Sequence, residues 1–329
     1  MQLAGGKPPV GVLFDSDMGN SIDDVLALAI LYGLDGKNEA RVISVSVSKA
    51  NLKGAALAEV LRRFYAVRGG LNGEGRGLPV GLSARGKMPE DTPIFKILEK
   101  RNEKGENVHR HRIERMSDTA DVAPMLRNAL TSQQDANATV VMVGPATNMA
   151  ELLELPGARH WISRKVKYLS MMGGAYPVSK EPEFNIKADI KAAQKLFAEW
   201  PTPIVASGFE VGNQLRYPAA SIENDFGWSE NHPVADAYRA AEKMPYDAPC
   251  WDPSSVLYAV RPDGGFFKLS EPGTISVSDD GNTKFTAGAG GKHRYLILDP
   301  AQKEKIVKTF VELASAKKRP PPKPGAPAN

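Results

Sequence analysis

Residues 14–24 read FDSDMGNSIDD, and Asp15, Asp17, Asp23 and Asp24 bring four carboxylates into this short stretch. It follows the apolar run VGVLF (residues 10–14) and precedes the apolar run VLALAILYG (residues 25–33). Apolar residues recur at helical spacing from Val25 to Tyr32, so residues 23–33 are predicted to form an amphipathic helix ended by Gly33. The stretch therefore predicts a buried strand, an acidic loop and a helix in direct succession, which is the start of an α/β unit.

Strand and helix patterns alternate through most of the chain that follows. Further strands are predicted at 41–48, 78–82, 138–144, 165–174, 202–208 and 294–298, and helices at 54–67, 118–133, 147–155, 189–200, 232–244, 253–260 and 301–316. Residues 273–288 read as a hairpin. This alternation predicts right-handed βαβ connections and a mostly parallel sheet flanked by helices, an α/β fold with a Rossmann-like core. We assign residues 10–316 to one domain, 1–9 to a flexible N-terminus and 317–329 to a disordered, proline-rich tail.

Composition and charge limit the classes of partner. The 329 residues are 42% hydrophobic and 24% charged, with a formal net charge of +4. Basic residues are scattered, so no nucleic acid is expected as a partner, and no apolar run approaches the roughly 20 residues of a membrane span. Cys250 is the single cysteine, which excludes an intrachain disulfide and leaves the compartment open. We expect a cytoplasmic protein if the chain is complete, and a periplasmic or secreted one if a signal peptide has been removed.

The acidic loop is the predicted site of chemistry, because ligands of parallel sheets bind beyond the carboxyl ends of the strands. Aspartates at a helix start commonly cap free N–H groups, which accounts for Asp23 or Asp24 but not for all four carboxylates. Like charges in one loop repel one another unless a cation compensates them. Because no histidine or cysteine lies nearby, Ca²⁺ or Mg²⁺ is favoured over zinc.

Two families begin with such a loop. In aspartyl phosphatases of the haloacid dehalogenase class, Thr or Val normally follows the second Asp and the other acidic pair lies far downstream. Here Met18 and Gly19 follow, and the second pair comes at once. The whole pattern, DSDMGNSIDD before an apolar helix, instead resembles the nucleoside hydrolase family of the inosine-uridine preferring type. Four later segments resemble signatures of that family in the expected order: SVSVSKANLKGAALAEVLRRF (44–64), VVMVGPATNMAELL (140–153), YLSMMGGAYPVSKEPEFNIKADIKAA (168–193) and WDPSSVLYAV (251–260).

The resemblance, which runs from about residue 10 to 316, implies a role for each matching residue. Asp17, Asp24 and Asp252 would bind Ca²⁺ through their side chains, and Val143 through its carbonyl. Asp23 would be the general base on the attacking water. The residues implied to support the loop or to contact ribose are Asp15, Asn51, Met172, Glu183 and Asn185. Capping is an alternative for Asn185, in the following turn, and for Asp252, before Pro253.

The chain departs from the family pattern in two places. The loop between Asp17 and Asp23 is two residues longer than in the best-known members, and Ser21 stands where related longer loops often carry another Asp. The best-known members also place His immediately before the last metal-binding Asp, where it assists departure of the base. Here that position is Trp251, whose indole cannot act as a general acid at neutral pH.

The sequence offers two substitutes for the missing general acid. Trp251 can stack on a flat base, and His109 or His111 can donate the proton if residues 83–116 fold over the site, although we interpret that segment as a solvated excursion rather than a lid. The resemblance thus implies a Ca²⁺-dependent hydrolase of the N-glycosidic bond of a ribonucleoside or related riboside, and Trp251 leads us to expect weakened or altered activity. The resemblance implies a homo-oligomer, a dimer or a tetramer. The alternatives are a non-catalytic protein that keeps the metal and ribose site, and a metal-dependent phosphohydrolase.

Overall fold

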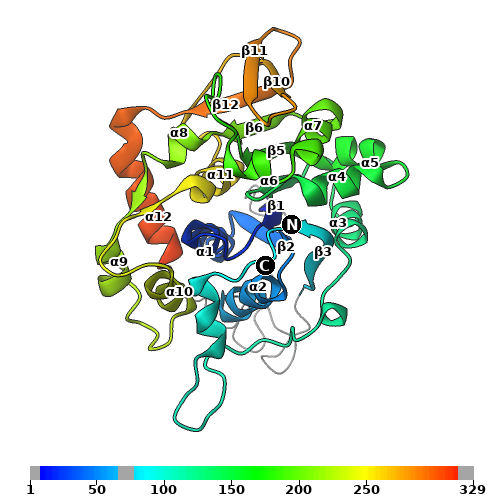
Figure 1. Ribbon diagram of the computed structural model, residues 1–329. Coiled ribbons are helices and arrows are strands. Elements are labelled where there is room, and N and C mark those ends of the chain that lie inside the picture. Colours follow the sequence, from blue (N-terminus) through cyan, green and yellow to red (C-terminus); the bar gives the residue numbers. More distant parts are fainter. Residues whose placement is uncertain (1–7, 66–77, 318–329) are drawn as a thin grey trace, which may run out of the picture.

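The computed structural model describes residues 8–65 and 78–317, in which one sheet lies between two layers of helices (Figure 1). The predictions for the flexible start and the proline-rich tail lie outside these residues, apart from positions 8, 9 and 317. The same holds for the end of the helix predicted at 54–67.

The main sheet has ten strands in the described residues, and most of them are parallel. Its parallel part runs in the order β12 (His293–Ile297), β6 (Ile204–Ser207), β5 (Val166–Met172), β4 (Ala138–Met142), β1 (Val10–Ser16), β2 (Ala40–Lys49) and β3 (Val80–Lys87). At the β12 end, three antiparallel strands extend it: β9 (Lys268–Leu269), β10 (Gly273–Val277) and β11 (Thr283–Ala287). A separate pair joins β7 (Arg216–Tyr217) to β8 (Ala248–Pro249). The predicted mostly parallel α/β fold is therefore confirmed.

Two hydrophobic cores lie on opposite faces of this sheet. One face is covered by α1 (Ile22–Gly36), α2 (Leu52–Tyr65), α10 (Pro233–Ala241), α11 (Trp251–Val260) and α12 (Lys303–Ala314). The other is covered by α3 (Val122–Thr131), α4 (Thr147–Glu154), α5 (Ala158–Lys165) and α7 (Ile190–Glu199). Short helices occur in the connections: α6 (Phe184–Ala188), α8 (Phe209–Gly212), α9 (Ala219–Asn224), and the 3₁₀ turns η1 (Pro93–Glu99), η2 (Met116–Asp118) and η3 (Pro300–Gln302).

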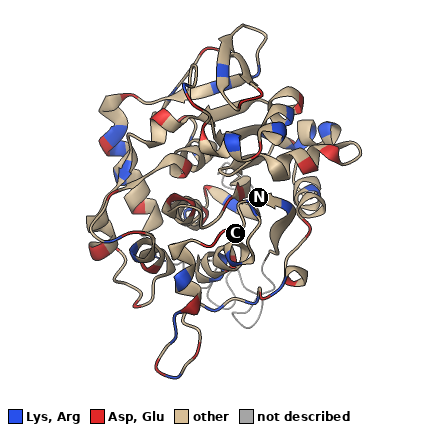
Figure 2. Ribbon diagram, viewed as in Figure 1, with Lys and Arg blue, Asp and Glu red and all other residues tan. Residues whose placement is uncertain are grey.

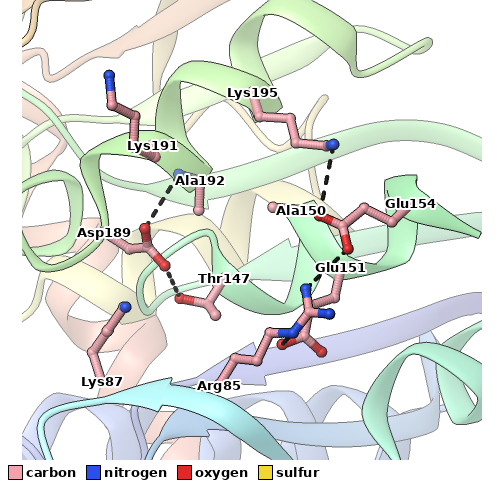
Figure 3. A pocket seen from close by; sticks show the side chains of 10 residues that line it. All are labelled: Arg85, Lys87, Thr147, Ala150, Glu151, Glu154, Asp189, Lys191, Ala192 and Lys195. Carbon is pink, nitrogen blue, oxygen red and sulfur yellow. Dashed lines mark hydrogen bonds and ion pairs between the residues drawn. The ribbon is translucent and has the colours of Figure 1, made fainter.

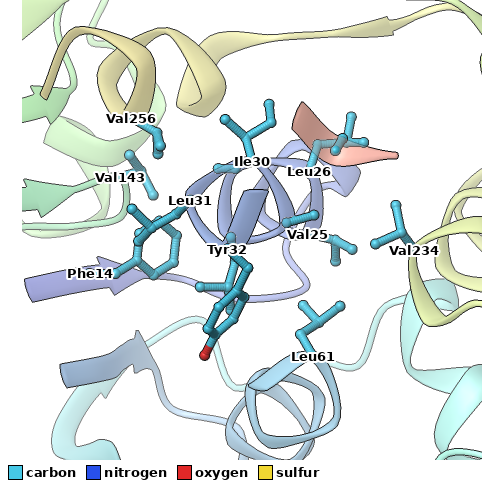
Figure 4. Packing of buried hydrophobic residues seen from close by; sticks show 14 of the residues in the cluster. Phe14, Val25, Leu26, Ile30, Leu31, Tyr32, Leu61, Val143, Val234 and Val256 are labelled. Atoms are coloured by element: carbon cyan, nitrogen blue, oxygen red, sulfur yellow. The ribbon is translucent and has the colours of Figure 1, made fainter. Parts of the chain in front are cut away.

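Helix α1 differs from its prediction in two respects. All residues from Ile22 to Leu34 are buried, so the helix is not amphipathic; neighbouring helices and the sheet surround it (Figure 4). It also continues past Gly33 to Gly36. A Cβ atom at position 33 would lie 2.3 Å from the carbonyl oxygen of Leu313, so this glycine permits close contact with α12 rather than ending the helix.

The segment 83–116 is not simply a solvated excursion. Its turn η1 packs against α2 and α10, and Phe95 belongs to the buried core, whereas residues 101–106 are exposed. Nε2 of His109 and Nζ of Lys100 each lie 2.7 Å from Oδ2 of Asp236 in α10. Hydrophobic packing and this polar cluster together hold the segment against the domain.

Charged residues of both signs are interspersed along the outer helices and loops (Figure 2). None of the helices in the described residues is both long and apolar enough to cross a membrane.

Candidate functional site

The predicted site residues meet at one edge of the sheet, where four neighbouring strands end. Asp15 lies at the end of β1, Asn51 follows β2, Val143 follows β4, and Met172 ends β5. The first turn of α1 adds Asp23 and Asp24, α6 adds Glu183 as its N-cap and Asn185, and α11 begins with Trp251 and Asp252. These residues thus lie at or beyond the carboxyl ends of the strands, where the sequence led us to expect the site.

Asp15 is buried and held between two strands and a helix. Its Oδ1 accepts hydrogen bonds from Oγ of Ser46 (2.5 Å) and from Nδ2 of Asn148 (2.6 Å), whereas Oδ2 has no partner. Burial raises the pKa of Asp15 to about 7, and the hydrogen bonds from Ser46 and Asn148 oppose that rise. The side chain ties β1 to β2 and α4 and keeps one buried oxygen available.

Asp17 and Asp24 form a close carboxyl pair. Burial raises the pKa of Asp17 well above its ordinary value, and the charge of Asp24 raises it further. Asp24 is oriented by a hydrogen bond from the Ser16 hydroxyl and by one from the backbone N–H of Ser21 at 3.1 Å. Burial raises the pKa of Asp24 to about 7, with a further contribution from the charge of Asp23. Oδ2 of Asp17 is buried without any hydrogen-bond partner.

Asp23 connects the start of α1 to the start of α11. Its Oδ1 accepts from the hydroxyl of Ser21 (2.5 Å), and its Oδ2 accepts from the backbone N–H groups of Trp251 and Asp252 (both 3.1 Å). Burial raises the pKa of Asp23, while these hydrogen bonds favour the carboxylate and oppose that rise.

The carboxyl group of Asp252 faces the acidic cluster rather than capping α11. The N-cap position belongs to Cys250, and no hydrogen bond in the described residues involves the Asp252 side chain. Burial raises the pKa of Asp252 well above its usual range, and the charges of Asp23, Asp24 and Asp17 raise it further. Asp252 therefore does not cap α11, and the capping alternative is wrong.

This donor set fits a hard cation. The buried carboxyl groups of Asp17, Asp24 and Asp252 repel one another, and Oδ2 of Asp17 lacks any hydrogen-bond donor. Both features are costly unless positive charge is supplied. No group of three Asp, Glu, His or Cys side chains in residues 8–65 and 78–317 is drawn together at the spacing of a metal centre.

The residues expected around ribose interlock with one another. Nδ2 of Asn185 lies 3.2 Å from the carbonyl oxygens of Val143 and Met172 and from Sδ of Met172. The carboxylate of Glu183 accepts from the N–H groups of Gly174 (2.9 Å) and Asn185 (3.0 Å), so Glu183, not Asn185, caps the turn. Burial raises the pKa of Glu183.

Asn51 is already engaged by the protein. Its Nδ2 donates to the carbonyl of Pro89 (2.8 Å) and to Oδ1 of Asp91 (2.9 Å), and its Oδ1 accepts from the backbone N–H of Lys53. The neighbouring hydroxyl of Thr92 donates to the carbonyl of Gly19 in the acidic loop at 2.5 Å. Asn51 therefore helps to hold the segment after β3 beside that loop.

Trp251 pairs with Phe209, a residue that the sequence did not single out. The two rings stack with centroids 5.7 Å apart and planes 24° apart, and Phe209 is 45% exposed. The indole N–H of Trp251 is buried without a partner. A Cβ atom at Gly212 would lie 2.2 Å from Cα of Trp251, so a glycine in α8 permits this close contact with α11. Nε2 of His109 is engaged elsewhere, with Oδ2 of Asp236 at 2.7 Å.

The polar side chains that donate hydrogen bonds to the aspartates were also not identified from the sequence. Ser16, Ser46 and Asn148 orient the aspartates, yet serines in a strand and an asparagine in a helix carry no distinctive local signal. Only the position of Asn148, at the start of the helix that follows β4, placed it at the correct edge of the sheet.

Comparisons with known proteins give consistent results. The profile of the family described as inosine-uridine preferring nucleoside hydrolase matches residues 12–316. The pyrimidine-specific ribonucleoside hydrolase RihA of Klebsiella pneumoniae is 30% identical over 151 residues, covering 42% of this chain and 47% of the relative. The chain thus spans about half the length of the curated relatives it matches.

Solved structures match over nearly the whole chain. The plant nucleoside hydrolase PpNRh1 has a TM-score of 0.69 at 20% identity, covering 94% of this chain and all of that one (100%). An inosine-uridine preferring nucleoside hydrolase from Bacillus anthracis has a TM-score of 0.67 at 18% identity, covering 93% of this chain and 99% of that one. At these identities the likeness establishes the fold.

Proposed function

The chain belongs to the inosine-uridine preferring nucleoside hydrolase family, and from this we propose that it hydrolyses the N-glycosidic bond of a ribonucleoside or related riboside in a Ca²⁺-dependent reaction. The observation that carries the proposal is the meeting of Asp17, Asp23, Asp24 and Asp252 beside Glu183 and Asn185 at one edge of the sheet. Cleavage of a glycosidic bond passes through a cationic, oxocarbenium-like state, which buried carboxylates stabilise.

The cation would be held by Asp17, Asp24, Asp252 and the carbonyl of Val143. The unpartnered Oδ2 of Asp17 and the mutual repulsion of the three carboxyl groups support this assignment. When bound, Ca²⁺ supplies a positive charge that lowers the pKa of a water and orients ribose hydroxyls.

Asp23 would take the proton of the attacking water. Its hydrogen bonds from Ser21, Trp251 and Asp252 hold the carboxylate in one orientation, and Oδ1, which accepts a single hydrogen bond, retains a free lone pair. Glu183 and Asn185 would bind ribose hydroxyls, Met172 would lie beneath the sugar ring, and Asp15 would support the loop. Asn51 would reach the ligand only by exchanging its bonds to Pro89 and Asp91.

The leaving base would be held by the stacked rings of Trp251 and Phe209. The unpartnered indole N–H can donate a hydrogen bond to an acceptor on the base, but it cannot deliver a proton. We therefore propose weak turnover of ordinary nucleosides and faster turnover of ribosides whose leaving group needs no protonation.

A sugar-release assay tests the proposal with inosine and guanosine, with uridine and cytidine, and with p-nitrophenyl riboside, each with Ca²⁺ and with a chelator. Ca²⁺-dependent release of ribose is expected. Ribose binding without release from any substrate would support the non-catalytic alternative, and release of phosphate from a phosphomonoester without sugar release would support a phosphohydrolase.

A further inference from the structure

An open cavity of about 230 Å³ with charged residues in its walls lies beside the candidate site (Figure 3). Its walls come from the end of β3, from α4 and from the start of α7. A cavity needs only roughly 10–15 Å³ to hold one water, so this one has room for a group of several atoms.

The charges that line the cavity do not balance. Four basic residues, Arg85, Lys87, Lys191 and Lys195, contribute to the lining together with three acidic ones, Glu151, Glu154 and Asp189. Asp189 accepts from the hydroxyl of Thr147 (2.7 Å) and from the N–H of Ala192 (3.3 Å).

The two glutamates are also engaged. Glu154 lies 2.9 Å from a guanidinium nitrogen of Arg85 and 3.7 Å from Nζ of Lys195. Glu151 accepts from the hydroxyl of Ser83 at 3.0 Å and lies 3.9 Å from Nε of Arg85. All three acidic side chains therefore already have partners.

Lys87 is the basic residue of the cavity whose amino group has no partner in the described residues. Within residues 8–65 and 78–317, no hydrogen bond or ion pair involves its amino group, which in Figure 3 points toward the space beside Asp189 and Thr147. Nζ of Lys191 is only loosely engaged, 3.1 Å from Gln194 and 3.4 Å from Asp279, on a side chain that is 81% exposed. In Figure 3 the amino group of Lys191 points away from the cavity, so Lys87 is the side chain that offers a free ammonium group to an anion there.

The cavity adjoins the residues proposed to bind ribose. Thr147 in its wall precedes Asn148, which donates to Asp15, and Asp189 ends the helix α6 that carries Asn185. Lys87 pairs in register with Lys49, two positions before Asn51. A ligand whose ribose lies over β4 and β5 therefore has this cavity next to it.

We propose that the cavity binds a phosphate group, and that the ligand of the site is a phosphorylated riboside such as a nucleoside 5′-phosphate. The statement about the ligand rests on the proposed function; the statement about the anion site does not. Lysine is a common phosphate ligand, acting as a point charge with three donors.

Titration calorimetry on the full chain with Ca²⁺ tests the proposal independently of turnover, with ribose, ribose 5-phosphate and inorganic phosphate as probes. Ribose 5-phosphate is expected to bind at least about tenfold more tightly than ribose, as one charge-assisted hydrogen bond implies. Lys87→Gln should remove most of that advantage and leave ribose binding unchanged. Lys191→Gln should weaken it less, because the amino group of Lys191 points away from the cavity and lies near Gln194 and Asp279.

Lys167→Gln is the matched control, since Lys167 is exposed, has no partner in the described residues and lies at the opposite end of β5. Equal affinity for ribose and ribose 5-phosphate would overturn the ligand assignment, even if inorganic phosphate bound in a Lys87-dependent manner. Binding of both phosphate probes that is insensitive to Lys87→Gln would overturn the site itself. If sugar release fails but ribose 5-phosphate binds through Lys87, the proposed hydrolysis is wrong and the anion site stands.

Discussion

Oδ2 of Asp23 accepts a hydrogen bond from the backbone N–H of Asp252 at 3.1 Å, across 229 positions of sequence. The N–H of Trp251 donates to the same oxygen, also at 3.1 Å. The residue proposed as the general base therefore also fixes the start of α11, which carries a proposed metal ligand and the aromatic ring beside the leaving group. Catalytic and structural effects of Asp23 must be separated by the choice of substitution.

Asp23→Asn should lower kcat by roughly 10²–10⁴-fold, the usual effect of removing a general base, with little loss of stability. The amide oxygen can still accept from the N–H groups of Trp251 and Asp252, whereas Asp23→Ala leaves both buried donors unsatisfied. The alanine variant should therefore also lose about 2 kcal/mol or more of unfolding free energy. Steady-state kinetics and urea unfolding measure the two effects, with Ser21→Ala as control for the loss of one hydrogen bond. Loss of Ca²⁺ affinity in Asp23→Asn equal to that in Asp24→Asn would mean that the two roles are wrongly divided.

Removal of Ca²⁺ should lower the melting temperature. A ligand that binds only the folded state stabilises it by about 4 kcal/mol at a concentration 1,000 times its Kd, and the charge repulsion among Asp17, Asp24 and Asp252 returns when it leaves. Differential scanning calorimetry with and without a chelator measures the shift. Asp17→Asn should abolish it, whereas Asp279→Asn, at an exposed position on the β10–β11 hairpin, should not. An unchanged melting temperature on chelation of the unsubstituted chain would rule out the metal assignment.

Local sequence signals predicted the parts of this site that depend on neighbours in the chain. The apolar run before Asp15 and the helical spacing after Asp24 placed the acidic loop correctly at the edge of the sheet. Partners that come from distant segments left no such signal: Asn148 reaches Asp15 from α4, and Phe209 reaches Trp251 from α8. The burial of α1 on all sides depends on helices from distant parts of the chain, such as α12, which no local pattern records.

The free energy of unfolding is expected to fall in mild acid because His293 becomes protonated. Burial lowers its pKa to about 4, with a smaller contribution from Lys292, and Nδ1 accepts from the N–H of Ile275 at 2.9 Å, which requires that nitrogen to be unprotonated. Because the ordinary pKa is 6.5, the unfolded chain binds a proton that the folded chain does not between pH 6.5 and 4. The stabilisation is thus complete above pH 6.5 and is lost as pH falls toward 4, by at most about 3 kcal/mol.

Urea unfolding at pH 7.5, 6 and 5 measures this dependence, with the pH series of His293→Gln subtracted to remove the contribution of the buried carboxyl groups. Gln can accept the same hydrogen bond without titrating. The unsubstituted chain should lose more stability between pH 7.5 and 5 than His293→Gln does. Parallel pH profiles of the two proteins would contradict the assignment.

The stacked pair of Trp251 and Phe209 should determine which ribosides are cleaved. Neither ring can protonate a departing base, so p-nitrophenyl riboside is expected to be hydrolysed far faster than inosine or uridine. Stacking of a base on an aromatic side chain contributes about 1–3 kcal/mol, so Phe209→Ala should raise KM for inosine by roughly tenfold. Phe209→Tyr keeps an aromatic ring and is the matched control.

Trp251→His should raise the turnover of inosine relative to that of p-nitrophenyl riboside, because imidazole can donate a proton to the base and the activated leaving group needs none. The ratio of the two kcat values is the decisive measurement, since it cancels any general loss of folded enzyme. The N–H of residue 251 that donates to Asp23 belongs to the backbone and is retained in this variant. An unchanged ratio would mean that position 251 does not face the leaving group. Absence of turnover for both substrates in the unsubstituted chain with Ca²⁺, together with measurable ribose binding, would replace the proposed hydrolase by a ribose-binding protein that keeps the family's site.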